Sequence, residues 1–307
     1  MRVMTLYNPI AGAGRAAKAG RAVCDALRRA GHEARLAETS LGPRKQWLDP
    51  QISGVDLIVV VGGDGAMRLA SGAARRSQTP LYHYPVGTEN LCAREFGTDR
   101  SLARLLAAIE RFEVKRFDLG TANDRDFLLM ASVGYDAEVV ADLAARRGSR
   151  ITHLTYLAPM LRQFVRFKPP RLSVAVDGKA IVDDREGCLV VGNSRQYARR
   201  FDPACRASMT DGLLDVVFFP TRSRRELLRW AIACRLRRHV ASDRLIYRLG
   251  RAVEVRCRPP QRYQLDGDPP ESPAGDETRA GVEADVGEPV VDLRISLCPS
   301  VLPVLIP

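Results

Sequence analysis

The chain has 307 residues, of which 46% are hydrophobic and 27% are charged. This composition excludes wholesale disorder and leaves room for two domains with substantial cores. A net charge of +11 favours an anionic partner, either a nucleic acid or the surface of an anionic membrane.

Cysteine usage and the N-terminus favour a cytoplasmic protein. The seven cysteines form no paired spacing, which is typical of reduced thiols. The N-terminus lacks the apolar region of a signal peptide, and no apolar stretch approaches the roughly 20 residues of a transmembrane helix. We therefore expect peripheral membrane association and no transmembrane segment. The basic residues are dispersed without a recognition motif, so a nucleic-acid partner is not expected. A homodimer remains open.

The first 118 residues alternate strand and helix. Apolar runs predict four strands, at Val3–Tyr7, Glu33–Glu38, Asp56–Val61 and Leu81–Val86. Helical patterns lie between and after them, at Arg15–Ala30, Ala66–Ala74, Leu91–Phe96 and Ser101–Phe112. This alternation predicts a doubly wound α/β sheet.

From about Lys115 the pattern changes to strands and hairpins. Asp177-Gly178 is a strong signal for a two-residue hairpin turn. Helical stretches interrupt the strands near 150–167 and 222–240, and the acidic, Pro/Gly-rich residues 269–288 predict a mobile surface loop. The second half of the chain is therefore predicted to be mostly antiparallel β.

The most informative stretch is DLIVVVGGDG at 56–65, an apolar strand that ends in glycines. Gly62, Gly63 and Gly65 lack Cβ atoms, so a ligand can approach their amide groups closely. The helix that follows offers its N-terminus to an anion. A carboxylate beside phosphates, here Asp64, usually implies a magnesium ion. The alternative is a tight connection whose aspartate caps the helix.

Two more glycine turns follow strand ends. Residues 8–14, NPIAGAG, come after the first strand, and residues 85–90, PVGTEN, come after the fourth. Ligands bind outside the carboxyl ends of the strands in an open α/β sheet, so these turns are expected to converge on one phosphate site. Neither turn has Walker or GxGxxG spacing. Taken singly, Asn8 and Thr88 could instead cap helices.

These three motifs, in this order, resemble the catalytic domain of the diacylglycerol kinase family, which includes sphingosine and ceramide kinases and bacterial soluble lipid kinases. The resemblance continues through SVGYDAEVV, GNSRQYARRFDPACRASMTDGLLDVVFF, YQLDGD and CPSVLPVLIP. It implies an ATP-binding α/β domain at 1–118 with a C-terminal return at 299–307. It also implies a β-sandwich lipid-substrate domain at 119–298, with the active site in the cleft between the two domains.

The resemblance also implies an activity and its residues. The expected reaction moves the ATP γ-phosphate to a lipid hydroxyl at an anionic membrane surface, with diacylglycerol as default substrate and Mg²⁺ as cofactor. The residues that match the family's nucleotide contacts are Asn8, Gly12, Thr39, Gly62, Gly63, Asp64, Gly65, Ala66 and Thr88. Those that match its structural magnesium site are Asp211 and Asp215, with the main-chain carbonyls of Ser208 and Leu213. From the residues alone, the latter segment is equally a polar β-turn.

The expected catalytic base is Asp268, the third residue of Asp266-Gly267-Asp268, where the family has glutamate. The shorter side chain moves the carboxylate by roughly 1 Å, which can cost about a hundredfold in rate. Ala66 replaces a threonine of the family pattern, and arginines at 199–200 replace glycines. Two alternatives therefore stay open, namely an NAD kinase-like enzyme and a catalytically weak, membrane-associated nucleotide-binding regulator.

Two helical segments raise the question of membrane access. Ser223–Val240 combines leucines, Trp230 and six arginines, a pattern that suits the interface of an anionic membrane. Its leucines could equally cover the sandwich while its arginines are solvated. Ile151–Phe167 has a broader apolar face that could line an acyl-chain entrance or pack in the core.

Overall fold

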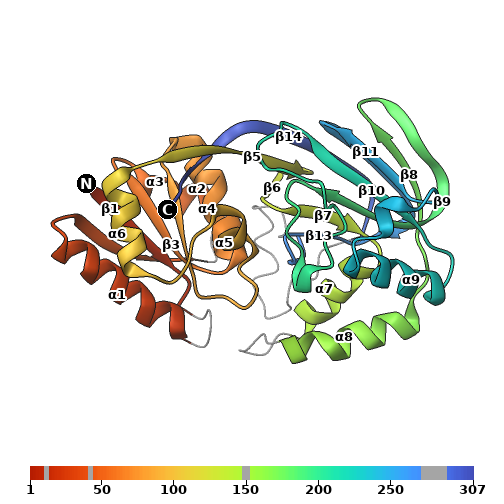
Figure 1. Ribbon diagram of the computed structural model, residues 1–307, viewed down its shortest axis with the longest axis horizontal. Coiled ribbons are helices and arrows are strands. Elements are labelled where there is room, and N and C mark those ends of the chain that lie inside the picture. Colours follow the sequence, from red (N-terminus) through yellow and green to blue (C-terminus); the bar gives the residue numbers. More distant parts are fainter. Residues whose placement is uncertain (10–13, 41–43, 147–152, 271–288) are drawn as a thin grey trace. The chain divides into compact units, whose positions relative to one another are not determined.

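The computed structural model describes residues 1–9, 14–40, 44–146, 153–270 and 289–307. The chain forms two compact units (Figure 1), unit 1 comprising Met1–Asp118 with Ser300–Pro307 and unit 2 comprising Leu119–Pro299. Two strands, β5 (Val114–Ala122) and β14 (Val290–Leu305), each carry the chain from one unit into the other.

Unit 1 is built on a parallel sheet in the order β2-β1-β3-β4, with the end of β14 beside β4. Its strands are β1 (Arg2–Tyr7), β2 (Glu33–Glu38), β3 (Leu57–Gly62) and β4 (Leu81–Pro85). Its helices are α1 (Arg15–Arg29), α2 (Arg44–Trp47), α3 (Asp49–Ile52), α4 (Asp64–Ser77), α5 (Leu91–Phe96) and α6 (Leu102–Arg111). The predicted doubly wound sheet is confirmed, and the short helices α2 and α3 are additions to it.

Burial explains why this sheet reads so clearly in the sequence. Every residue of β3 is buried, and one face of the sheet packs against α1 and α6. Side chains of a strand alternate between faces, and Ile58 and Val60 are as fully buried as their neighbours. Helix α4 also packs against β3 and β4. Both faces are therefore covered, as expected for parallel strands made of uninterrupted apolar runs.

Helix α4 begins at Asp64, two residues earlier than the sequence pattern predicts. Gly63 is its N-cap, with an extended backbone, and the amides of Ala66 and Met67 both donate to the Gly63 carbonyl, at 3.1 and 3.2 Å. Asp64 and Gly65 consequently belong to the first helical turn rather than to a loop. Their N–H groups are the first two of the helix, which have no intrahelical acceptor.

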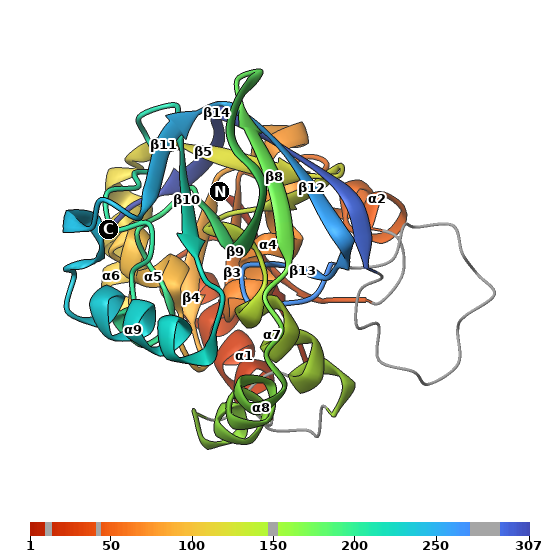
Figure 2. The same cartoon turned by 90° about the vertical axis from the view of Figure 1, so that its right-hand side faces the viewer.

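Unit 2 is the predicted antiparallel β-sandwich, and its two sheets share the long strand β9. One sheet has the order β6-β5-β14-β12-β8-β9 and the other β11-β10-β9-β7-β13. Figure 2 shows β8, β12 and β14 side by side. The remaining strands of the unit are β6 (Arg125–Phe127), β7 (Met130–Val133), β8 (Arg171–Val176), β9 (Lys179–Gly192), β10 (Leu214–Pro220), β11 (Ile246–Gly250), β12 (Ala252–Gln261) and β13 (Tyr263–Leu265).

The turn and helices of unit 2 agree with the sequence in part. Asp177 and Gly178 both have positive φ, 47° and 76°, and join β8 to β9 in the predicted two-residue hairpin. The helices are α7 (Tyr135–Ala145), α8 (His153–Arg166) and α9 (Arg224–Arg235), with 3₁₀ turns at Ala198–Arg200 and His239–Ala241. Only α8 and α9 were expected. Among the described residues, no helix has the length and apolar character needed to cross a membrane.

Candidate functional site

The carboxyl ends of four parallel strands meet at one edge of the unit 1 sheet. Tyr7, the last residue of β1, is in register with Glu38 of β2 and Val61 of β3, and Gly62 is in register with Pro85 of β4. The segments that follow these residues carry the expected nucleotide contacts, and neighbouring strands lie about 4.8 Å apart. The sheet therefore gathers these segments at one edge.

Some of the expected contacts can be placed individually at this edge. Thr39 follows β2, and its amide donates to the Tyr7 carbonyl at 2.9 Å. Asn8 is half-buried after β1, and Thr88 is exposed in the turn after β4. Gly12 lies outside the described residues.

Two of the glycine turns abut backbone to backbone. A Cβ atom built on Gly87 would lie 2.7 Å from the Gly63 Cα, and one built on Gly63 would lie 3.3 Å from the Gly87 Cα. Asn90 holds the second turn closed, because its side chain accepts from the Gly87 amide at 2.9 Å and donates to the Gly87 carbonyl at 3.0 Å. Contact between the turns therefore requires glycine at position 87 and leaves little room for a side chain at position 63.

Asp64 connects the first glycine turn to the neighbouring helix. Its Oδ1 accepts from the amide of Cys92, the second residue of α5, at 2.8 Å. The residues alone suggested that this aspartate could cap the helix that follows it, but the helix that it caps is α5. The N–H groups of Asp64 and Gly65, at the positive end of α4, remain suited to an anion. The Ala66 amide donates to Gly63.

His83 on β4 contacts the first glycine turn through the Gly62 carbonyl. No sequence motif had pointed to this histidine. The imidazole is fully buried, and its Nε2 lies 3.1 Å from the Gly62 carbonyl oxygen. Burial lowers the pKa of His83, while the charge of Asp64 acts in the opposite direction. The ring is thus held neutral and donates Nε2–H to Gly62, which fixes the peptide plane at the strand end.

The expected magnesium ligands lie at the start of β10 in unit 2. Asp215 is 1% exposed, its Oδ1 accepts from the Tyr247 hydroxyl, and its Oδ2 is buried without a hydrogen-bond partner. Burial raises the pKa of Asp215 to about 6, against the hydrogen bond from Tyr247, and the charge of Asp211 raises it further. A cation beside Oδ2 would remove this penalty.

The surroundings of Asp215 suit a hard cation. Asp211 is exposed and accepts from the Leu213 amide at 3.0 Å, and Ser208 lies half-buried in the same segment. In the described part of the chain, no group of three or more His, Cys, Asp or Glu side chains could hold a metal. Two carboxylates completed by main-chain oxygens and water suit Mg²⁺ better than a softer ion.

The expected catalytic base stands on a tight turn after β13. Leu265 and Asp268 exchange backbone hydrogen bonds of 2.9 and 3.0 Å around Asp266 and Gly267, both of which have positive φ. This is a two-residue hairpin turn of the type that Asp-Gly favours. It leaves the Asp268 side chain half-buried on a rigid support.

Asp266, the first residue of this turn, has a different environment. It is 8% exposed, and its carboxylate accepts from three consecutive amides, those of Leu128 and Leu129 at 2.7 Å and that of Met130 at 3.0 Å. The side chain thereby ties the turn to the start of β7. Sequence reasoning assigned Asp266 no role, although its place in the Asp-Gly-Asp motif was a signal.

A partly buried polar network also contacts this turn. The Asp136 Oδ2 accepts from the hydroxyls of Ser132 and Tyr197, at 2.6 and 2.9 Å. Gln264 donates to the Ser132 Oγ at 2.7 Å and accepts from the Gly267 amide at 2.7 Å. Burial raises the pKa of both Asp136 and Tyr197. The network therefore joins the first turn of α7 to the turn that carries Asp268.

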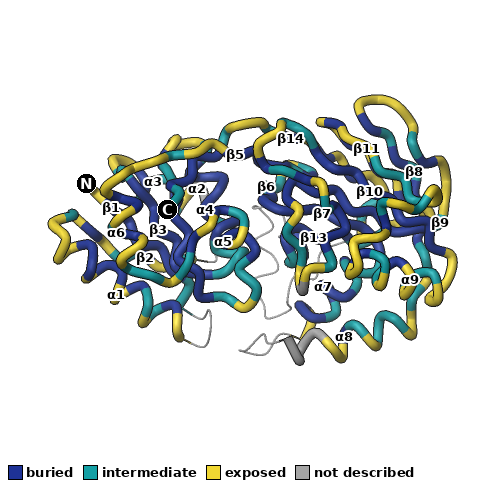
Figure 3. Tube along the Cα trace, in the orientation of Figure 1, coloured by how far each residue is buried: buried dark blue, intermediate teal, exposed yellow. Residues whose placement is uncertain are grey.

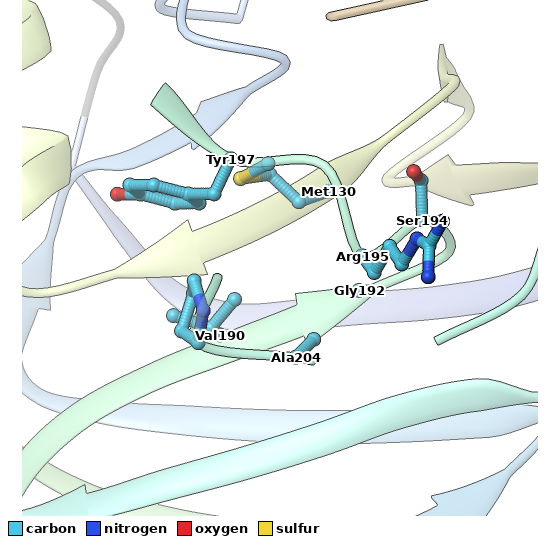
Figure 4. Close-up of a pocket in the computed structure, with 8 residues that line it drawn as sticks. Met130, Val190, Gly192, Ser194, Arg195, Tyr197 and Ala204 are labelled. Carbon is cyan, nitrogen blue, oxygen red and sulfur yellow. The ribbon is translucent and has the colours of Figure 1, made fainter. Parts of the chain in front are cut away.

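Beside Tyr197 lies a shallow depression with no room for a water molecule, lined by Met130, Val190, Gly192, Ser194, Arg195, Tyr197, Pro203 and Ala204. Figure 4 shows Met130 next to Tyr197, with Val190 and Ala204 below them. Pockets for small molecules are usually of about 300–1,000 Å³, so this space is too small to hold a lipid or a nucleotide.

Comparison with protein families matches both halves of the chain. Residues 2–122 match the family described as the diacylglycerol kinase catalytic domain. Residues 130–294 match the YegS C-terminal NAD kinase beta sandwich-like domain.

Individual relatives agree with these families. The chain is 27% identical over 275 residues to a diacylglycerol kinase of Mycobacterium tuberculosis, covering 87% of this chain and 88% of the relative. It is 31% identical over 210 residues to a probable YegS-like lipid kinase of Pseudomonas aeruginosa, covering 66% and 67%. The solved structure of a putative diacylglycerol kinase from Bacillus anthracis has the same fold, with a TM-score of 0.72, 18% identity and coverage of 100% of this chain and 97% of that chain.

Proposed function

The chain belongs to the family of diacylglycerol kinase-like lipid kinases, and on that premise we propose that it transfers the γ-phosphate of ATP to a lipid hydroxyl, with diacylglycerol as the default acceptor. The observation that carries the nucleotide assignment is the pair of abutting glycine turns at the carboxyl edge of the unit 1 sheet. Such turns present backbone donors, which suit phosphate groups.

In this proposal the ATP phosphates lie against the start of α4. The N–H groups of Asp64 and Gly65 donate to the anion, and the glycines at 62, 63 and 87 let the two turns pack closely against each other and against Ala66. Asn90 and His83 contribute indirectly by fixing the two turns. Because these donors are held before the nucleotide arrives, little reorganisation is needed as charge develops on the transferring phosphoryl group.

Asp268 is the proposed general base. Its carboxylate accepts the proton of the lipid hydroxyl as that oxygen bonds to the γ-phosphorus, while the bond from the γ-phosphorus to the bridging oxygen breaks and ADP leaves. The products are a phosphorylated lipid, which for diacylglycerol is phosphatidic acid, and ADP. The turn at Asp266-Gly267 supports the base, since a general base must be held within hydrogen-bond reach of its proton.

Asp211 and Asp215 are the proposed ligands of Mg²⁺ in unit 2. The buried, unpartnered Oδ2 of Asp215 supports this assignment. When bound, the ion supplies positive charge that compensates the buried carboxylate and thereby stabilises the start of β10.

The test is incubation of the purified protein with labelled ATP, Mg²⁺ and mixed bacterial lipids, with the product identified by mass spectrometry. Asp268→Asn should lower turnover by about a hundredfold or more while ATP binding persists. Asp183→Asn, at an exposed position of β9, is the matched control and should leave turnover unchanged. Asp268→Glu should raise turnover if the shorter side chain limits the rate.

Two results would reject the proposal. Faster phosphorylation of NAD than of any lipid would favour the NAD kinase-like alternative. ATP binding without lipid phosphorylation, together with activity gained in Asp268→Glu, would favour a nucleotide-binding regulator.

A further inference from the structure

Exposed apolar side chains are concentrated on two helices of unit 2. Of the ten large hydrophobic residues that are exposed in the described part of the chain, six lie on or directly after α8 and α9. They are Leu157, Leu161 and Val165, exposed by 52, 58 and 65%, and Leu228, Ile232 and Leu236, exposed by 51, 51 and 58%. Successive members of each set are four residues apart, so each set forms a stripe along one side of its helix. We call these six residues the α8–α9 face.

The stripe of α9 lies on the outside of a helix that is already packed. Trp230 and Cys234, only 8 and 5% exposed, form a core cluster with Phe219, and the Trp230 indole donates to the Pro220 carbonyl at 2.9 Å. The sequence left two alternatives open for this segment, namely a helix with a tryptophan at a membrane interface or a helix whose leucines cover the sandwich. In the structure the tryptophan is buried and Leu228 and Leu236 are exposed, so these two leucines are not needed for packing within unit 2.

Helix α8 is likewise fixed by residues outside its stripe. The Tyr135 hydroxyl of α7 donates to the Met160 carbonyl at 2.8 Å, and Arg162 forms an ion pair with Asp142 at 2.8 Å. The two helices also meet, since Arg224 donates to the Val165 carbonyl at 3.2 Å. Both helices lie at the same end of unit 2 (Figures 1 and 2), and most of residues 157–166 of α8 and most of α9 are exposed or intermediate (Figure 3).

The charge around the stripe of α9 is positive. Arg225 and Arg229 each precede a stripe residue by three positions, and Arg235 follows one by three, so all three adjoin the stripe. All are exposed, and among the described residues none has an ion-pair partner. The carboxylate of Glu226, by contrast, is occupied by the Arg222 amide and the Arg244 guanidinium.

We propose that the α8–α9 face docks this protein on an anionic lipid bilayer. Leucines and isoleucine would enter the boundary between headgroups and acyl chains, while the arginines contact lipid phosphates. Charge complementarity selects this occupant, because a second copy of the chain would bring the same cationic face and repel it. The proposal goes beyond the phosphoryl transfer, since docking requires neither ATP nor a reacting lipid.

The test is sedimentation of the full-length protein with vesicles, without ATP. Binding is expected to vesicles of phosphatidylglycerol mixed with phosphatidylcholine and to be at least about tenfold weaker to phosphatidylcholine alone. Leu228→Asn/Ile232→Asn should abolish most of the binding. Replacing Arg225, Arg229 and Arg235 by glutamine should weaken it by roughly fivefold per arginine and reduce its salt dependence.

Matched controls distinguish binding through the α8–α9 face from non-specific membrane binding and from the effects of misfolding. Leu249→Asn, at a position 53% exposed on β11, and Arg185→Gln, exposed on β9, should bind vesicles as the parent protein does. The variants of the face should keep the circular dichroism spectrum of the parent. They should also keep its phosphorylation of dispersed short-chain diacylglycerol, so loss of docking is distinguishable from loss of the proposed reaction.

Three results would overturn the proposal. These are no binding of the parent protein to anionic vesicles, equal binding by the variants of the face and by the controls, and a lipid-free dimer that the same variants dissociate. The last result would assign the face to contact between copies of this chain.

Discussion

Replacing Asp266 by asparagine should destabilise unit 2 strongly, although the two side chains have the same shape. The carboxylate is 8% exposed and accepts three amide hydrogen bonds. If the asparagine oxygen takes the place of Oδ1, it retains Leu129 and Met130 as donors but loses the charge that strengthens both bonds. Its NH₂ group then faces the Leu128 amide, leaving two donors opposed in a buried site.

The cost follows from these three contacts. An unpaired buried donor costs about 1–3 kcal/mol, and each of two charge-assisted bonds loses about 1 kcal/mol when its acceptor becomes neutral. The sum is about 3–5 kcal/mol, a large part of the roughly 5–15 kcal/mol that stabilises a folded protein. The expected result is a clear shift of the urea midpoint.

The chain allows unit 2 to be monitored separately. Of its two tryptophans, Trp47 lies in unit 1 and Trp230 is buried in unit 2. In a Trp47→Phe background, fluorescence during urea unfolding therefore reports unit 2 alone, which avoids treating a two-unit chain as two-state. Asp268→Asn, two residues along the same turn, is the control and should keep the parent midpoint while losing turnover. A loss below about 1 kcal/mol in Asp266→Asn would refute the hydrogen-bond argument.

Three further predictions concern the ligand sites. Gly87→Ala should weaken ATP binding, because its Cβ would lie 2.7 Å from the Gly63 Cα and push the turns apart, and an unchanged ATP dissociation constant would contradict this. Ala66→Thr should lower the ATP dissociation constant by up to roughly tenfold if the missing hydroxyl weakens phosphate binding, as measured by calorimetry. Burial raises the pKa of Asp215 from 3.8 to about 6, so the protonated form is favoured in the folded state and stability should fall as pH rises through this interval. Mg²⁺ should therefore raise the melting temperature more at about pH 8 than at about pH 5, and Asp215→Asn should remove that difference.

The sequence predicts unit 1 well, and three of its strands, β1, β3 and β4, are buried on both faces. β2 and α5 have the predicted bounds, and β3 differs by one residue at each end. The start of α4 was placed too late, since the helical pattern begins with apolar residues while the N-cap is set by hydrogen bonds to the Gly63 carbonyl. Those bonds depend on the backbone conformation of Gly63, and the sequence does not determine it because glycine can adopt many conformations.

Unit 2 shows what a linear pattern misses. Helix α7 was not predicted. Its residues Val139 and Val140 are β-branched, which favours strands, yet both are buried as helical residues. The network at Asp136 could not be predicted either. Its partners Tyr197 and Gln264 lie 61 and 128 positions away in sequence, and only the folded sandwich brings them together.

Three aspartates of unit 2, Asp136, Asp215 and Asp266, lie in sequence motifs but differ in how far their carboxylate oxygens are hydrogen-bonded. Asp266 uses both carboxylate oxygens on backbone amides, and Asp136 is surrounded by donors, so each is stabilised by protein groups alone. Asp215 is more deeply buried than either of them by solvent exposure and keeps one oxygen without a donor. A buried carboxylate in that condition costs free energy unless a proton or a cation joins it. The first two aspartates therefore fit a supporting role, whereas Asp215 has the unmet requirement that a metal ligand should have.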